Sequence, residues 1–343
     1  MRKTLSILLA IVMIAASLTA CGNSGGNSTD NGNTEEKTFN LKIADLWSSS
    51  HPVAAAVDNV FKKQVEEKSG GTITVDVYHD GLLGDEAALW QSVRDGSVDM
   101  VVVGSYMNQE FPMMLISDWP FLYRDLEHAK KVWTGSIADE VSAKFNERFP
   151  EVELLGWAPN SARTFTSNKK LTSVEDFVGQ KFRMPNNPIH VGIAENLGAS
   201  SQVIPLGELF SALETGVVDG QDNGMVTVIA QNLQEVQKYL YETNHIIATL
   251  EIIVNSDKLD EMSENQRQII RDAAKAAAEQ SWNDYIASVD SDRQTLIDAG
   301  VTVTQLTPED QAKIIEKIQP TIDKLLAEND WAAELTEKIK AVQ

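Results

Sequence analysis

The chain has 343 residues, of which 29 are basic and 50 are acidic, so its formal net charge at pH 7 is −21. This excess of acidic side chains argues against nucleic acid as a partner, because affinity for phosphates depends on clustered lysine and arginine. A single cysteine excludes an intrachain disulfide, and the stability of the fold must therefore come from packing.

The amino-terminal segment has the pattern of a secretory signal. Two basic residues precede an apolar run over residues 5–18, which is shorter than the roughly 20 residues that cross a membrane. The sequence LTAC that ends this segment resembles a lipobox, so we expect residues 1–20 to be removed and Cys21 to carry a lipid. The alternative is an unmodified signal with an incidental cysteine.

Residues 21–38 are expected to form a flexible tether, because residues 22–37 contain no apolar side chain to bury. A random coil of about 16 residues spans roughly 20–25 Å, which would let a lipid-anchored body pivot beside a membrane protein. Loss of Arg2 and Lys3 with the signal leaves 27 basic residues (29 less these two) against 50 acidic ones, a net charge of −23.

The body of about 305 residues is long enough for two domains. Apolar periodicity predicts that its first part alternates strands with helices, namely a strand over residues 41–46, a helix over 53–65, a strand over 72–78, a helix over 85–95 and a strand over 98–103. This order favours a mostly parallel sheet with helices on both faces.

The later elements follow the same kind of pattern. We predict helices within residues 118–149, a strand over 152–157, a short helix at 172–179, a helix over 226–240 and a strand over 245–254. Residues 264–299 lack proline and glycine and predict one helix of roughly 50 Å. A strand over 301–306 and C-terminal helices, interrupted at Pro320, complete the chain.

Two consecutive β-α-β units are expected over residues 181–224. Three short apolar runs alternate there with two helical patterns, the runs covering residues 181–184, 202–205 and 217–222. Parallel strands joined in this way carry ligands beyond their carboxyl ends, and Arg183 and Asn223 lie at two such ends.

The stretch FRMPNNPIHV, followed by LGA and by ELFSALETGVVDGQDN, resembles the signature region of the DctP-type solute receptors of tripartite ATP-independent periplasmic (TRAP) transporters. The likeness runs from about residue 41 to about residue 300 and is most specific between Arg163 and Asn223. It implies a two-domain α/β fold of the type II periplasmic-binding-protein class, with a cleft between the domains and a long helix that spans both. The expected domain I comprises residues 39–160 plus about 249–288, and domain II comprises residues 161–248 plus about 289–343.

The resemblance also implies a binding site. In that family an arginine at the place of Arg183 forms a two-pronged ion pair with the ligand carboxylate, since the planar guanidinium presents parallel donors. Arg163 and Asn223 match residues that hold the same ligand. Gly224 stands where the family usually has proline, which leaves the loop after Asn223 open.

Weaker candidates are side chains expected to face the cleft, and these are Trp47, His51, Glu86, Asn160 and Asn187. The residues alone also allow simpler roles, in which Arg183 pairs with a neighbouring acid and Asn223 caps the helix after it.

Together these features predict an extracytoplasmic lipoprotein that binds a small organic acid and passes it to TRAP membrane subunits, as a monomer without enzymatic activity, cofactor or metal. The histidines lack zinc-ligand spacing, and the loop that starts at Asp219 has Ala230 where calcium binding needs a glutamate. A uronate or aldonate is favoured over a C4-dicarboxylate, because Glu86 would repel a second carboxylate. Two alternatives stay open: a receptor domain for a signalling partner, and a secreted hydrolase.

Overall fold

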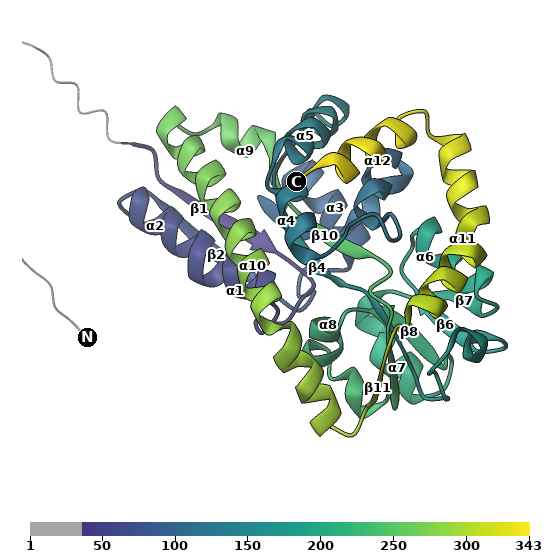
Figure 1. Cartoon of the computed structure of the whole chain (residues 1–343). Helices are drawn as coiled ribbons and strands as arrows, with labels where there is room; N and C mark the ends of the chain where they lie inside the picture. The colour runs from purple at the N-terminus through teal and green to yellow at the C-terminus, as the bar shows by residue number, and fades with distance from the viewer. Residues whose placement is uncertain (1–35) are drawn as a thin grey trace, which may run out of the picture. The chain divides into compact units, whose positions relative to one another are not determined.

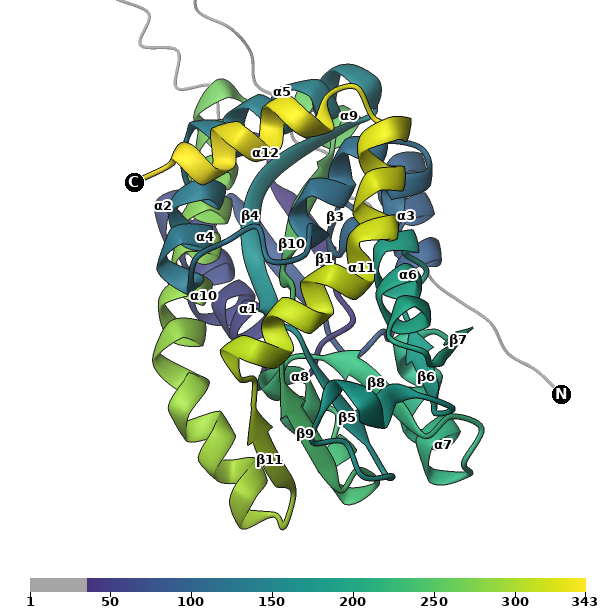
Figure 2. The same cartoon turned by 45° about the vertical axis from the view of Figure 1, so that its right-hand side comes forward.

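Two β-sheets organise residues 36–343, the part of the chain that the computed structural model describes. The predicted signal at residues 1–20, Cys21 and most of the predicted tether lie outside the described residues. Figures 1 and 2 show the first sheet among the purple, blue and green helices and the second sheet among the teal and green ones.

The first sheet has the strand order β2-β1-β3-β10-β4. Its strands are β1 (Phe39–Ala44), β2 (Ile73–Tyr78), β3 (Met100–Val103), β4 (Val152–Ala162) and β10 (Ile247–Asn255). The first three are parallel, as predicted, and β10 runs antiparallel to β3 and β4. The helical segments between these strands are α1 (Pro52–Ala56), a π-helical turn (Val57–Lys62), α2 (Lys63–Lys68), α3 (Glu86–Asp95), α4 (Leu126–Trp133), α5 (Ser136–Arg148) and the 3-10 helices Ser105–Gln109 and Pro112–Asp118.

The second sheet has the order β11-β9-β5-β8-β6-β7. Its strands are β5 (Thr164–Ser167), β6 (Lys181–Met184), β7 (Ser200–Val203), β8 (Gly220–Asn223), β9 (Tyr239–Glu242) and β11 (Thr302–Gln305). Strand β6 is parallel to β7 and β8, so the two predicted β-α-β units are present. The intervening helices are α6 (Pro188–Asn196), α7 (Leu209–Glu214) and α8 (Met225–Ala230), with 3-10 helices at Val174–Phe177, Leu206–Glu208 and Leu233–Glu235.

The long helix α10 (Glu264–Asp298) follows the short α9 (Ser256–Asp260) and contacts elements of both sheets, including β4 and β11. It runs along one side of both layers in Figure 2. Ala273, Ala274, Ala277 and Ala278 are buried in the middle of this helix. A Cβ atom added at Gly156 of β4 would lie 3.3 Å from the Ala278 Cβ, so small residues on both sides let the helix approach the sheet closely.

The C-terminal helices α11 (Pro308–Glu328) and α12 (Ala332–Ala341) also bridge the layers, because α11 packs on α6 and α12 packs on the 3-10 helix Pro112–Asp118. The predicted interruption at Pro320 is wrong, since α11 continues through it. Buried Ile314, Ile318 and Leu325 extend the apolar face on both sides of the proline, so burial outweighs the lost hydrogen bond. No helix within residues 36–343 is both long and apolar enough to cross a membrane.

The helix predicted over residues 226–240 is also wrong in its second half. Helix α8 ends at Ala230, Asn232 adopts a left-handed backbone with φ of 54°, and the chain then forms β9. An asparagine tolerates this conformation better than most residues and reverses the chain, which apolar periodicity alone does not reveal.

Candidate functional site

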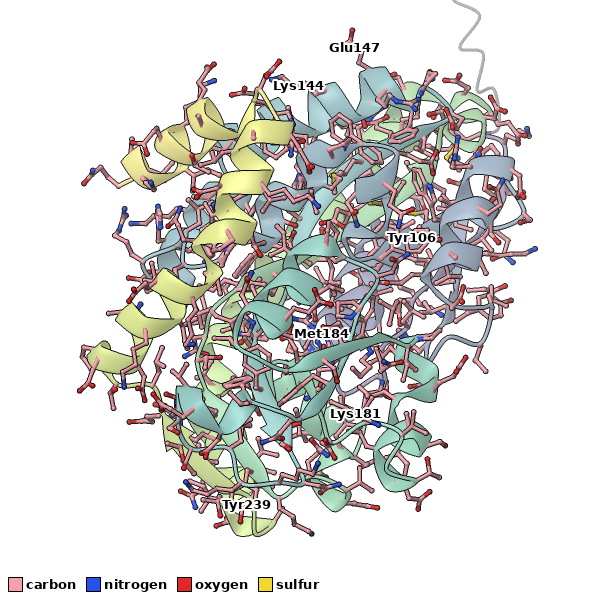
Figure 3. The ribbon with its side chains drawn as sticks, turned by 90° about the vertical axis from the view of Figure 1, so that its right-hand side faces the viewer. Tyr106, Lys144, Glu147, Lys181, Met184 and Tyr239 are labelled. Carbon is pink, nitrogen blue, oxygen red and sulfur yellow. The ribbon has the colours of Figure 1, made fainter. Side chains whose placement is uncertain are left out.

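Arg183 lies in β6 and faces a cavity of about 630 Å³. Its neighbours Phe182 and Met184 are fully buried, and Arg183 itself is 4% exposed. The guanidinium Nε donates to the carbonyl of Ile204 at 2.7 Å, which fixes the direction of the side chain. In Figure 3 the carboxyl end of β6, marked by Met184, faces the layer that carries Tyr106, while Lys181 lies on the far side.

Arg183 forms no ion pair within residues 36–343, although the charges of Glu86 and Asp222 act on it from farther away. Among the described residues, no carboxylate oxygen comes within 4.0 Å of its guanidinium. Burial, followed by the nearby charge of Arg163, lowers the pKa of Arg183 to about 10. A buried cation without an ion-pair partner is costly unless an anion completes the site.

Residues from both layers form the wall of this cavity. They are Leu46, Asp80, Gly81, Gly84, Asp85, Glu86, Ala87 and Tyr106 from the first layer, and Arg183, Pro185, Asn186, Val203, Ile204, Pro205, Leu206, Gly207, Glu208 and Gln231 from the second. Glu86 begins α3, and its Oε1 accepts the Gly104 N–H at 3.1 Å. Burial raises the pKa of Glu86, even though Arg183 opposes this rise.

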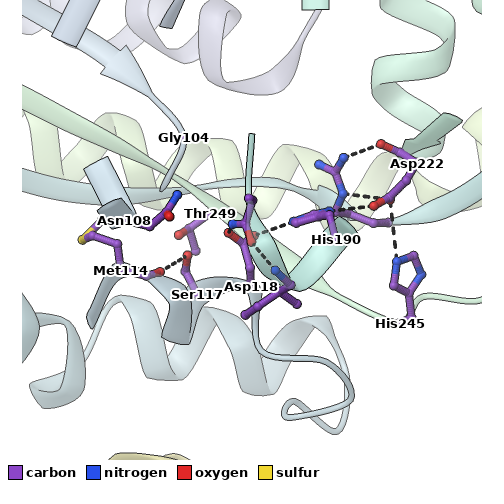
Figure 4. Close-up of polar contacts among 12 residues, drawn as sticks. Gly104, Asn108, Met114, Ser117, Asp118, His190, Asp222, His245 and Thr249 are labelled. Atoms are coloured by element: carbon purple, nitrogen blue, oxygen red, sulfur yellow. Dashed lines mark hydrogen bonds and ion pairs between the residues drawn. The ribbon is translucent and has the colours of Figure 1, made fainter. Parts of the chain in front are cut away.

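Arg163 lies between β4 and β5 and is engaged by Asp222 of β8. Its Nε donates to Asp222 Oδ1 at 2.9 Å, and its Nη2 donates to the Asp222 carbonyl. Asp222 also accepts from His190 Nδ1 at 2.6 Å and lies 3.7 Å from His245 Nε2 (Figure 4). Burial opposes ionisation of Asp222, but these positive and donor groups outweigh it and hold the pKa of the carboxyl well below its usual range.

Asp118 joins the same polar cluster from the first layer. Its Oδ2 accepts from Asn187 Nδ2 at 2.7 Å, and its Oδ1 lies 3.5 Å from His190 Nε2. Asn187 is the N-cap of α6, where its Oδ1 accepts the Ile189 N–H. A second cavity of about 50 Å³ adjoins this cluster, and Asn160, Arg163, Asn187 and Glu86 are among the residues that line it.

Asn223 is 4% exposed at the end of β8, but it lines neither cavity. Its Nδ2 donates to Gln221 Oε1 at 2.6 Å, and its carbonyl accepts the Thr164 hydroxyl. It does not cap α8, because the N-cap position belongs to Gly224, so the simpler role considered for Asn223 is wrong.

Gly224 has a φ of −76°, which proline can adopt. A Cβ at this position would nevertheless lie 2.1 Å from the Ser161 Cβ. Ser161 therefore leaves room for glycine at position 224 but not for a residue with a Cβ atom.

Trp47 and His51 lie close together, with ring centroids 5.8 Å apart, but they line neither cavity. Trp47 is 2% exposed in the core of the first layer. His51 is fully buried as the N-cap of α1, and burial lowers its pKa to about 3. The structure thus places Arg183 and Glu86 at the larger cavity, Arg163, Asn160, Asn187 and Glu86 at the smaller one, and Trp47, His51 and Asn223 at neither.

Sequence reasoning did not single out Asp118, His190 or Asp222 as site residues. One signal was available, because His190 follows the candidate Asn187 by three residues and lies in the first turn of the helix that Asn187 caps. No group of three or more histidine, cysteine or carboxylate side chains within residues 36–343 is arranged to hold a metal ion.

Known proteins resemble this chain in sequence and in structure. Family 7 of the bacterial extracellular solute-binding proteins (DctP) matches residues 43–329. The 2,3-diketo-L-gulonate-binding periplasmic protein YiaO of Escherichia coli is 29% identical over 249 residues, which cover 71% of this chain and 74% of that protein.

Two solved structures are similar along most of the described chain. A TRAP periplasmic solute-binding protein from Haemophilus influenzae with bound L-gulonate aligns with a TM-score of 0.85 at 27% identity, covering 89% of this chain and 100% of the other. One from Chromohalobacter salexigens with bound D-glucuronate aligns with a TM-score of 0.82 at 26% identity, covering 88% and 100%.

Proposed function

We propose that this chain, which belongs to the family 7 bacterial extracellular solute-binding proteins, captures a sugar acid outside the cytoplasmic membrane and delivers it to a TRAP membrane transporter. The single observation that carries the ligand assignment is Arg183, a buried cation that faces a cavity and has no carboxylate partner within residues 36–343.

A carboxylate suits this position by geometry as well as by charge. Nε of Arg183 is occupied by the carbonyl of Ile204, which leaves the two terminal nitrogens to a ligand. A planar guanidinium grips a carboxylate with parallel hydrogen bonds, and such charge-assisted pairs are stronger when water is excluded. The cavity of about 630 Å³ is within the range of small-molecule sites.

The remaining charges of the cavity favour hydroxyl groups over a second carboxylate. Apart from Arg183, its charged lining residues are all acidic, namely Asp80, Asp85, Glu86 and Glu208. Carboxylates accept hydrogen bonds from hydroxyls and repel another anion. The ligands named for the two similar structures, L-gulonate and D-glucuronate, each combine one carboxylate with several hydroxyls, which supports the same choice.

The proposal extends to the ends of the chain and to its motion. Cys21 carries the lipid that keeps the protein at the membrane, and residues 21–38 form the tether. Domain I (residues 39–160 with about 249–288) and domain II (161–248 with about 289–343) close over the ligand by a hinge movement. The closed form then presents the transporter with a surface that the empty form lacks.

A thermal-shift screen of the purified protein against organic acids tests the ligand class. D-glucuronate, D-galacturonate and D-gluconate are compared with succinate and malate, and a ligand at 100 times its Kd stabilises the protein by about 2.7 kcal/mol. We expect at least one sugar acid to raise the Tm. A response to succinate without any response to the sugar acids would overturn the assignment of a sugar acid as the ligand. The absence of a response to every carboxylate tested would overturn the assignment of the cavity at Arg183 as a ligand site.

A further inference from the structure

Four ionisable side chains form a continuous line from one sheet layer to the other. Asp118 ends the 3-10 helix Pro112–Asp118 of the first layer, while His190 of α6 and Asp222 of β8 belong to the second. Figure 4 shows His190 between the two carboxylates. Arg163 extends the line, because its Nε donates to Asp222 Oδ1. All four side chains are buried, with exposures of 1% to 5%.

The two nitrogens of His190 have different partners. Nδ1 lies 2.6 Å from Asp222 Oδ2, and Nε2 lies 3.5 Å from Asp118 Oδ1. A neutral imidazole has one N–H, whereas the imidazolium has two and can serve both carboxylates. Burial and Arg163 lower the pKa of His190, but Asp222 and Asp118 outweigh both and raise it.

We propose that Asp118 and His190 are positioning residues of the anion site: Asp118 keeps His190 charged, and charged His190 holds the Asp222–Arg163 pair so that the site accepts an anion. The effect on ligand affinity rests on the function proposed above, while the control of His190 by Asp118 does not.

The proton on His190 sets the net charge of these four side chains. With His190 charged, two cations balance Asp118 and Asp222. Without that proton the line carries one net negative charge beside the cavity that receives a carboxylate. Other titratable groups near the line are His245 from the β9–β10 connection, whose pKa burial lowers, and Glu251 of β10 and Tyr123, whose pKa values burial and the charge of Asp118 raise. Glu86 and Arg183 lie at the adjoining cavities. None of these supplies a replacement proton to Asp222 and Asp118 together.

The sign of the pH dependence follows from the raised pKa of His190. His190 keeps its proton to a higher pH than an ordinary histidine and loses it as the pH rises above the shifted value, so affinity for an anion declines in that direction. Two unit charges separated by about 8 Å at an effective dielectric constant of 20 give a change in Kd of roughly tenfold to thirtyfold. By reciprocity, binding of the anion raises the pKa of His190 by about 1 to 1.5 pH units.

The test begins with the ligand-free mature protein, in which ¹⁵N NMR of the imidazoles follows each histidine through a pH titration. We expect His190 to titrate above the ordinary histidine value and Asp118→Asn to bring its pKa down. Titration of His190 at or below the ordinary value, or an unchanged pKa in Asp118→Asn, would overturn the proposal.

The second arm measures the Kd of D-glucuronate by calorimetry between pH 6 and 10. The wild type should lose affinity at the pH where His190 titrates, and Asp118→Asn should show the loss at lower pH. His79, whose pKa its hydrogen bond with Asp45 raises to about 9, titrates in the same window, so His79→Asn serves as the matched control and should leave the profile unchanged. The same profile in wild type and Asp118→Asn would count against the proposal. Failure of D-glucuronate, D-galacturonate and D-gluconate all to bind would count against the proposed function, while the NMR arm would still decide whether Asp118 controls His190.

Discussion

Replacement of Arg183 by methionine should stabilise the ligand-free protein while it abolishes ligand capture. Burial lowers the pKa of Arg183 to about 10, a displacement that corresponds to about 3 kcal/mol against the charged form. Loss of the hydrogen bond to the Ile204 carbonyl costs about 1 kcal/mol in return. The expected net gain in the free energy of unfolding is therefore about 2 kcal/mol, or a rise in Tm of about 4 °C.

Urea unfolding of the ligand-free protein measures this gain, and the chain offers a matched control. Arg293 has two hydrogen bonds to the carboxylate of Glu242, at 2.8 Å and 2.6 Å, and Glu242 is 6% exposed. Arg293→Met should reduce the free energy of unfolding, because it leaves a buried carboxylate without its partner. If Arg183→Met loses as much stability as Arg293→Met, then Arg183 is a structural ion-pair residue and the argument for an anion site is refuted.

Three further predictions concern other parts of the chain. Cys21→Ser should release the protein from the membrane fraction without changing ligand affinity, because two acyl chains on one cysteine suffice for stable anchoring; a serine variant that stays with the membrane contradicts this. His79 gains its proton on folding through Asp45, so its contribution to stability is complete below pH 6.5 and is lost as the pH rises through about 9; urea titrations at several pH values should show this slope, and His79→Asn should flatten it. Gly224→Pro should reduce the free energy of unfolding by about 2 kcal/mol, because its Cβ meets Ser161, and adding Ser161→Gly should recover part of the loss; a harmless single substitution would show that the loop adapts.

The parts of the fold that the sequence predicted are those with local causes. The long helix was expected at residues 264–299 and is found at Glu264–Asp298, because an uninterrupted run of helix-forming residues needs no tertiary information. The two β-α-β units around Arg183 were likewise readable, and the chain has the type II periplasmic-binding fold of the TRAP solute-binding proteins. The four-residue strand β5 and the left-handed Asn232 were not readable, since cross-strand pairing and a chain reversal determine them.

The candidate site likewise contains residues whose position follows from local sequence and residues that only the tertiary fold brings together. That Arg183 faces a cavity was predictable, because it lies near the end of a strand inside a recognisable pattern. The line from Asp118 to Arg163 was not, because Asp118 and His190 are far apart in the chain and meet only when the two layers fold together. The position of Trp47 and His51 in the loop after β1 suggested that their side chains face a cleft. In the structure the indole of Trp47 lies in the core and the imidazole of His51 caps α1.

Calorimetric titration of D-glucuronate into the wild type, Arg183→Lys and Arg183→Ala tests the central claim most directly. Lysine keeps the charge but cannot form two parallel hydrogen bonds, so it should restore only part of the affinity lost in the alanine variant. Loss of a buried, charged hydrogen-bond partner costs about 2–5 kcal/mol, so the Kd of Arg183→Ala should rise roughly 30-fold to 5,000-fold. An unchanged Kd in Arg183→Ala would contradict the claim that this arginine anchors the carboxylate.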